Sequence, residues 1–193
     1  MSDDRIQDYK KAFIRYTTLQ NRHPESRKAI EWLRSNVEKF VPTVQGHEGL
    51  GKTASEIMPG KFYLYGYDPK WKKVLPVYDT FPYILVTSVN YSNYSFRGIN
   101  FHYLPYTTRV NIFASLYEIA ANTKIPGGKK DGMIWRRAQA IAEVIGASKF
   151  LGESIKMYLF THVKTTFIQV PKEDWALTAF LPVAQMHYNR KSQ

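Results

Sequence analysis

Hydrophobic residues recur at helical spacing at the amino-terminal end of the chain. In residues 4–20 the apolar positions fall every three or four residues, which is the period of an amphipathic helix. A second helix is predicted over residues 23–40, because Pro24 is well tolerated in the first turn of a helix. Residues 41–60 contain prolines and glycines that interrupt any regular element. We therefore expect one unit over residues 1–58, made of amino-terminal helices and a glycine-rich loop.

From Gly60 the pattern changes to the two-residue alternation of β-strands. Four short apolar segments separated by turn residues follow one another over residues 60–104, and residues 90–95 have the composition of a hairpin tip. Gly66 and Gly98 lie inside these segments, where a glycine marks a bulge or a sharp bend. The pattern predicts a small, curled antiparallel sheet or a partial barrel.

The helical period returns once the sheet segments end. We predict helices over residues 106–160, with the last of them over 149–163. The β-branched segment 165–170 is predicted to return to the sheet, and a short terminal helix is predicted over 172–181. These elements form a second unit over residues 59–193. The predicted fold class is α+β, with the sheet flanked by amino-terminal and carboxyl-terminal helices.

Composition narrows the class of protein. Of the 193 residues, 44% are hydrophobic and 15% are aromatic, so the chain can bury a substantial core. It has no cysteine, which excludes a disulfide scaffold, a thiol nucleophile and a thiolate metal site. No apolar stretch approaches the length of about 18 residues that a membrane span requires, so we expect no membrane partner. The charged start is unlike a signal peptide.

The formal net charge of +11 comes from Lys and Arg residues that are spread evenly along the chain. No basic run is longer than two residues. Such a spread suits a protein embedded among acidic neighbours, or one that contacts a phosphate backbone without reading bases. The alternative is a basic surface with no nucleic-acid partner. We expect at most weak, sequence-independent binding to DNA.

One nucleotide-binding motif is matched in the sequence. Gly46, Gly51, Lys52 and Thr53 occupy the required positions of the phosphate-loop pattern G-x-x-x-x-G-K-[ST] over residues 46–53. A functional phosphate loop connects a buried strand to a long helix, whereas prolines and glycines interrupt the sequence on both sides of this match. We interpret the match as coincidental and expect it to bind no nucleotide or other cofactor.

No other arrangement of catalytic residues or metal ligands is visible. The five histidines show no paired ligand spacing, no G-x-S-x-G nucleophile motif occurs, and the acidic residues are scattered. We therefore expect no catalytic residues, no metal site and no cofactor. The sequence favours a protein that is not an enzyme.

Aromatic residues are concentrated over residues 62–106, where there are fourteen. Alternate strand residues face opposite sides, so four short strands cannot bury all of these rings on one face. Three explanations remain open: covering elements on both faces, contact with another chain, or stacking on single-stranded nucleic acid. We expect Tyr65, Trp71, Tyr91 and Tyr94 to form a protein–protein interface, because they lie in or near turns.

Two blocks of the sequence are unusual in composition. Residues 59–105 contain the segments PGKFYLYGYDPK, LPVYDTFP and GINFHYLP, and residues 156–186 read KMYLFTHVKTTFIQVPKEDWALTAFLPVAQM. Both blocks resemble a family of small proteins encoded by T-even-like contractile-tailed phages. The resemblance implies a phage protein that is made in the host cytoplasm and located in the virion. It brings no catalytic residues with it.

The resemblance and the aromatic content together favour one function. We expect a non-enzymatic structural component of the virion, in the neck, tail or baseplate, that acts through contacts with other virion proteins. The alternative is a DNA-binding or DNA-end-protecting phage protein that contacts the phosphate backbone.

Overall fold

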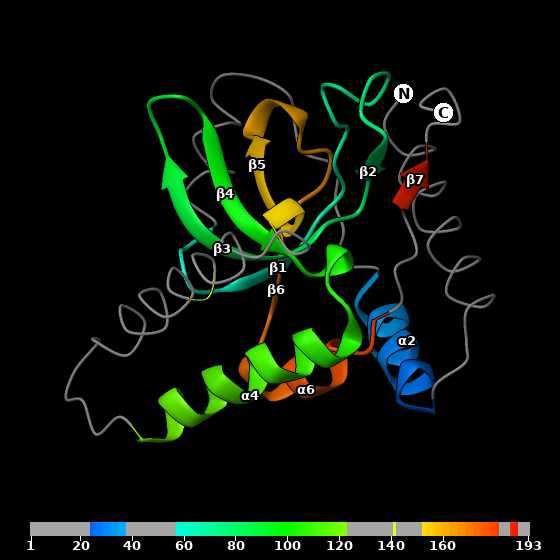
Figure 1. Ribbon diagram of the computed structural model, residues 1–193, viewed down its shortest axis with the longest axis vertical. Coiled ribbons are helices and arrows are strands. Elements are labelled where there is room, and N and C mark those ends of the chain that lie inside the picture. Colours follow the sequence, from blue (N-terminus) through cyan, green and yellow to red (C-terminus); the bar gives the residue numbers. More distant parts are fainter. Residues whose placement is uncertain (1–23, 38–56, 123–140, 142–151, 182–185, 189–193) are drawn as a thin grey trace.

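The computed structural model describes residues 24–37, 57–122, 141, 152–181 and 186–188. Within this part of the chain the fold is α+β, as the sequence predicts, and its five-stranded antiparallel sheet is open, not closed into a barrel. Three helices form a second layer on one side of the sheet (Figure 1). No helix among these residues is long and apolar enough to cross a membrane.

The main sheet has the strand order β5-β4-β3-β1-β6, and every neighbouring pair is antiparallel. Its strands are β1 (Phe62–Leu64), β3 (Tyr83–Asn90), β4 (Ser95–Asn100), β5 (Ile155–Leu159) and β6 (Ile168–Val170). Strands β3 and β4 form the predicted hairpin, with its tip between Asn90 and Ser95. Strand β6 lies beside β1, which confirms that the β-branched segment 165–170 returns to the sheet.

Strand β2 (Val77–Asp79) does not join this sheet, which corrects the expectation of a single sheet over residues 60–104. It pairs instead with β7 (Met186–Tyr188) in a separate two-stranded sheet. The chain turns directly after β2, because a side-chain oxygen of Asp79 accepts a hydrogen bond of 2.9 Å from the backbone N–H of Phe81. This local turn directs β2 away from the main sheet.

The prediction of a helix over residues 149–163 is wrong. Residues 155–159 form the edge strand β5, which lies between the 3₁₀ turns Gly152–Ser154 and Phe160–His162. Pairing with β4 places the ring of Tyr158 beside that of Phe96, with centroids 5.3 Å apart and planes 21° apart. Side-chain packing of this kind against a neighbouring strand outweighs the weak local preference of a short segment.

The helical layer consists of α2 (Pro24–Val37), α4 (Tyr106–Asn122) and α6 (Trp175–Thr178). Helix α2 confirms the predicted second helix, and α6 is shorter than the predicted terminal helix because the 3₁₀ turn Lys172–Asp174 precedes it. Trp32 of α2 donates a hydrogen bond of 2.7 Å from its indole Nε1 to Asp174, which joins α2 to the α6 region. The predicted helix over 4–20 lies outside the described residues.

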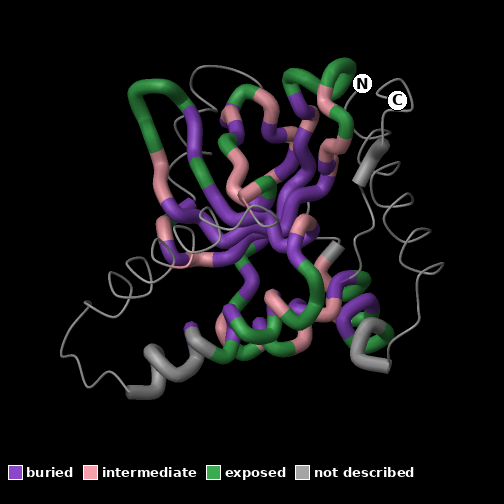
Figure 2. The backbone as a smooth tube through the Cα atoms, viewed as in Figure 1, coloured by how far each residue is buried: buried purple, intermediate pink, exposed green. Residues whose placement is uncertain are grey.

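Both faces of the main sheet are buried (Figure 2). One face packs against apolar residues of the three helices, including Leu33, Phe113 and Trp175. The other face carries a second cluster, in which tyrosines of β1 and the segment after it pack against Phe96 and Phe160. Eight of the fourteen aromatic residues are buried in this way, so coverage of both faces explains most of the aromatic content.

Gly98 lies at a β-bulge, as the sequence predicts. The register between β3 and β4 shifts between Val86 and Ser88, and Gly98 pairs with Val86 on the side where the shift begins. A Cβ atom at Gly98 would lie 2.7 Å from the backbone oxygen of Leu85, so only glycine allows the two strands to approach this closely.

Among the described residues of the helical layer, Arg109 is a fully buried cation. Its guanidinium donates hydrogen bonds to the backbone oxygens of Leu104 at 3.0 Å, Ala179 at 3.3 Å and Leu181 at 2.7 Å. Burial lowers the pKa of Arg109 to about 10, so the group is still a cation at neutral pH. The side chain therefore fixes the end of the α6 region against the start of α4.

Replacing Gly98 with alanine is expected to destabilise the protein by about 1–3 kcal/mol, because the added methyl group must displace the backbone of β3. The shift in the denaturant midpoint of unfolding measures this cost. An unchanged midpoint for Gly98→Ala would contradict this account.

Candidate functional site

A pocket of about 230 Å³ opens along the free edge of β5. One wall is β5 itself, and the opposite wall is the segment from Tyr67 to Tyr78. Asp79, Asn100 and Tyr103 complete the lining. Three parts of the sequence that are far apart therefore meet around one opening.

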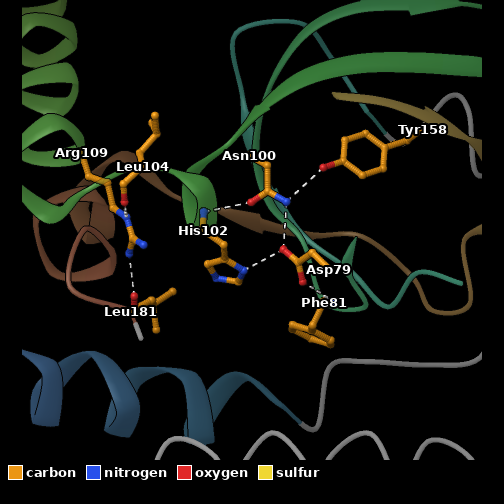
Figure 3. A network of polar contacts seen from close by, with 8 residues as sticks. All are labelled: Asp79, Phe81, Asn100, His102, Leu104, Arg109, Tyr158 and Leu181. Carbon is orange, nitrogen blue, oxygen red and sulfur yellow. Dashed lines mark hydrogen bonds and ion pairs between the residues drawn. The ribbon is translucent and has the colours of Figure 1, made fainter. Parts of the chain in front are cut away.

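The floor of the pocket is a buried polar network (Figure 3). One carboxylate oxygen of Asp79 accepts hydrogen bonds of 2.8 Å from the amide of Asn100 and 2.8 Å from Nδ1 of His102. The same amide nitrogen of Asn100 donates to the hydroxyl of Tyr158 at 3.1 Å, and its oxygen accepts from the backbone N–H of His102 at 2.9 Å. The network thus joins β2, β4 and β5.

The electrostatics of this network fix its charge states. Burial alone would raise the pKa of Asp79, but His102 and the hydrogen bonds from Asn100 and Phe81 outweigh burial and lower it. Asp79 is therefore an anion at neutral pH. Burial raises the pKa of Tyr158 well above its ordinary value and also raises that of Tyr67, so both phenols stay neutral.

The loop wall is held by local hydrogen bonds. Lys72 forms an ion pair of 2.6 Å with Asp68, and the backbone oxygen of Trp71 accepts hydrogen bonds of 2.9 Å from the N–H groups of Val74 and Leu75. The backbone N–H of Asp68 donates to the carbonyl of His162 at 2.9 Å, which ties the loop to the turn after β5. These interactions give the loop a defined conformation, in which Trp71 lies at the mouth of the pocket.

Two lysines accompany the aromatic lining. The Nζ atom of Lys70 lies 5.3 Å from the ring centroid of Trp71, and that of Lys156 lies 4.3 Å from the ring centroid of Tyr103. The ring of Trp71 is 60% exposed, whereas Lys156 is partly covered. Burial lowers the pKa of Lys156, and the charge of Glu153 opposes part of this effect. Cations beside accessible aromatic rings suit a ligand that has both a flat ring and an anionic group.

The buried Asp79–His102 pair does not face the pocket as an acid–base pair. His102 is not among the pocket-lining residues, and its Nδ1 atom is engaged by Asp79. Among the described residues there is no group of three or more His, Cys, Asp or Glu side chains that could hold a metal ion.

The predicted interface residues fall into two groups. Trp71, Tyr91 and Tyr94 are 60%, 61% and 42% exposed, with the two tyrosines at the tip of the β3–β4 hairpin. Tyr65 is fully buried, and the rings of Phe96, Tyr158 and other aromatic residues surround it. Its ring cannot reach a partner in this structure, because the second sheet face is covered. The expected contact of Trp71, Tyr91 and Tyr94 with another protein stays a prediction.

The phosphate-loop match with Gly46, Gly51, Lys52 and Thr53 lies outside the described residues, so its interpretation as coincidental stays a prediction. Sequence reasoning missed Lys70, Tyr103 and Lys156 as site residues. The adjacent pair Lys70–Trp71 was the available signal, since a cation next to an exposed indole in a turn is typical of a contact surface. Nothing in the local sequence places Lys156 opposite that pair.

A search of protein families gives one informative match. The family model described as phage T4 terminal DNA protecting protein matches residues 4–193. No curated protein and no solved structure matches the chain. The match confirms the resemblance to T4-like phage proteins at the level of the phage group.

The family description also contradicts the expected main function. A structural component of the neck, tail or baseplate was favoured because aromatic residues were counted as contact surface. Most of those rings are buried in the protein's own two cores, so the count does not require partner chains. The family description names protection of DNA ends, which is the alternative that the sequence left open.

Replacing Asp79 with asparagine is expected to lower the free energy of unfolding by about 2 kcal/mol at neutral pH, since charge-assisted hydrogen bonds are lost. The folded-state pKa of Asp79 lies below its ordinary value of 3.8. The contribution is therefore complete well above that pH and is lost as the pH falls through the folded-state pKa.

Urea unfolding at about pH 7 and about pH 3 checks this expectation. The difference between the parent protein and Asp79→Asn should be smaller at the lower pH. Glu173→Gln, an exposed change of the same chemistry, should alter stability by less than about 0.5 kcal/mol at either pH. A difference that is constant or grows towards acid pH would show that Asp79 does not contribute through its ionised form.

Proposed function

The chain belongs to the family of phage T4 terminal DNA protecting proteins, and from this premise we propose that it binds the end of a linear DNA and shields it without catalysing a reaction. The protein would act by occupying the terminus, so that an exonuclease cannot reach the terminal nucleotides. We propose the pocket beside β5 as the site of this contact.

The observation that carries the proposal is the arrangement at the mouth of the pocket. Trp71 presents an exposed indole, and Lys70 and Lys156 both line the opening. A DNA end exposes the flat face of its last base and the phosphates that follow it. Aromatic rings combined with cations are how proteins bind bases and phosphates without reading sequence.

The charge of the surrounding surface supports contact with phosphates. Lys70, Lys72 and Lys73 are all exposed on the loop wall, and Asp68 offsets the charge of one of them by its ion pair with Lys72. The net charge of +11 attracts DNA from a distance and is screened by salt. Such a surface supports association with any DNA, whereas the pocket supplies a preference for an end.

The proposal also includes a place for the protein in the phage life cycle. A phage protein is made in the host cell, and we propose that it remains on the DNA end in the virion. The exposed Tyr91 and Tyr94 at the hairpin tip would then contact a neighbouring virion protein. Mass spectrometry of purified particles should detect the protein at a fixed copy number, and its absence from particles would contradict this part.

The test of end binding compares DNA molecules that differ only in their termini. We expect tighter binding to a linear duplex than to the same duplex closed at both ends by non-nucleotide linkers, and slower digestion of the linear form by an exonuclease when the protein is bound. The double variant Lys70→Ala/Lys156→Ala should lose protection. Its slope of log affinity against log salt should also be smaller, by about 0.9 for each phosphate contact that is lost.

The matched control is Arg27→Ala/Lys28→Ala, which removes the same charge from exposed positions on α2 in the helical layer. It should retain protection. Equal binding to open and closed duplexes, or equal loss of protection in both double variants, would contradict end binding at the pocket.

A further inference from the structure

We propose that the pocket receives a single unpaired nucleotide at the DNA end, with its base stacked against Trp71 and its phosphate between Lys70 and Lys156. This inference rests on the proposed function and specifies the part of the DNA that the site recognises. It predicts that the protein distinguishes a frayed or overhanging end from a fully paired one.

The size of the pocket supports one base. Its volume of about 230 Å³ lies below the roughly 300–1,000 Å³ of pockets for drug-sized ligands. A single flat ring system fits this space, whereas a base pair, with two ring systems side by side, does not. A base therefore enters only when it is unpaired, and the energetic cost of entry is least where the base already lacks a partner.

The walls of the pocket suit a stacked base. Tyr67, Trp71, Tyr78, Tyr103 and Tyr158 contribute to its lining. Every nucleobase has a flat π-face, so stacking on such rings holds any base. The exposed indole of Trp71 at the mouth is the ring that a base meets first. Tyr91 on the hairpin has a similar exposed fraction but lies outside the pocket, so it serves as a comparison.

The charges of the pocket select a ring that carries a phosphate. Lys70 and Lys156 are the two cations in the lining, and both lie within about 6 Å of an aromatic ring, where a base and its phosphate can be held together. The one carboxylate in the lining, Asp79, is 5% exposed and already accepts hydrogen bonds from Asn100, His102 and Phe81. These hydrogen bonds stabilise the negative charge of Asp79 inside the floor of the pocket.

The amide of Asn100 does not read the identity of the base. Its nitrogen already donates to both Asp79 and Tyr158. Its oxygen already accepts from the backbone of His102. Stacking strength favours the larger ring system, so a terminal purine should bind more tightly than a terminal pyrimidine.

The experiment measures binding of the full-length protein to short duplexes by fluorescence anisotropy. Six DNAs share one sequence. Two are a blunt duplex and a duplex whose ends are closed by non-nucleotide linkers, which contain no unpaired base. The other four carry one unpaired terminal adenosine or one abasic nucleotide, each placed at the 5′ end or at the 3′ end. The inference predicts that the unpaired adenosine, at one end or both, strengthens binding over the abasic nucleotide by about five- to hundredfold.

The variants assign the effect to the pocket. Trp71→Ala should abolish the preference for the unpaired base over the abasic nucleotide, and Trp71→Phe should retain part of it. Tyr91→Ala, which removes an equally exposed ring, should leave the preference unchanged. Thermal melting shows that each variant is folded before its binding is compared.

The outcomes separate the two proposals. If open ends bind more tightly than closed ends but the abasic nucleotide binds as well as adenosine, the base-stacking inference is overturned and end binding stands. If open and closed DNAs bind equally, the proposed function itself fails. If the preference for adenosine survives in folded Trp71→Ala, the base lies elsewhere and the assignment to this pocket is wrong.

Discussion

A buried carboxylate is the constraint on which the rest of the site depends. A charge at Asp79 is tolerated in the interior only because Asn100, His102 and the backbone of Phe81 donate hydrogen bonds to it. These donors come from the turn after β2 and from the end of β4, and Asn100 also reaches Tyr158 on β5. The need to stabilise the buried charge of Asp79 thereby holds together the three segments that enclose the pocket.

The sheet provides a rigid support because most of both faces is covered. Helices cover one face, and an aromatic cluster around Tyr65 covers the other, with ring contacts between 4.8 and 6.1 Å. Aromatic rings bury large areas and restrict each other's orientation, so this cluster stabilises the sheet and fixes the position of its edge. Exposed rings on the adjoining loop then have a defined orientation without being part of a core.

Hydrophobic periodicity was enough to predict the elements that are determined by residues close together in the sequence. Helix α2, the β3–β4 hairpin, the bulge at Gly98 and the α+β class all follow from spacing and turn residues. Strand β5 and the pairing of β2 with β7 do not, because long-range strand pairing decides them and no short window of sequence contains both partners. The buried position of Tyr65 was missed for a related reason, since its covering residues come from distant parts of the chain.

The pocket was beyond local sequence reasoning for the same physical cause. Its lysines, Lys70 and Lys156, are distant in sequence and meet only because β5 forms the edge of the sheet. The adjacency of Lys70 and Trp71 was readable, and the exposure of Trp71 agrees with its position in a turn. The sequence therefore indicated the residue types on the loop side of the site, Lys70 and Trp71, but it did not indicate that Lys156 lies in the same pocket.

The hydrogen bonds of Arg109 have a consequence for the timing of folding. The backbone oxygens that accept two of these hydrogen bonds belong to Ala179 and Leu181, which are among the last described residues of the chain. Strand β1 is likewise fully paired only once β6 has joined it. A ribosome releases the amino-terminal part first, so the guanidinium of Arg109 emerges long before the groups that satisfy it. Neither layer can be completed before the segment that contains β6, Ala179 and Leu181 has left the ribosome.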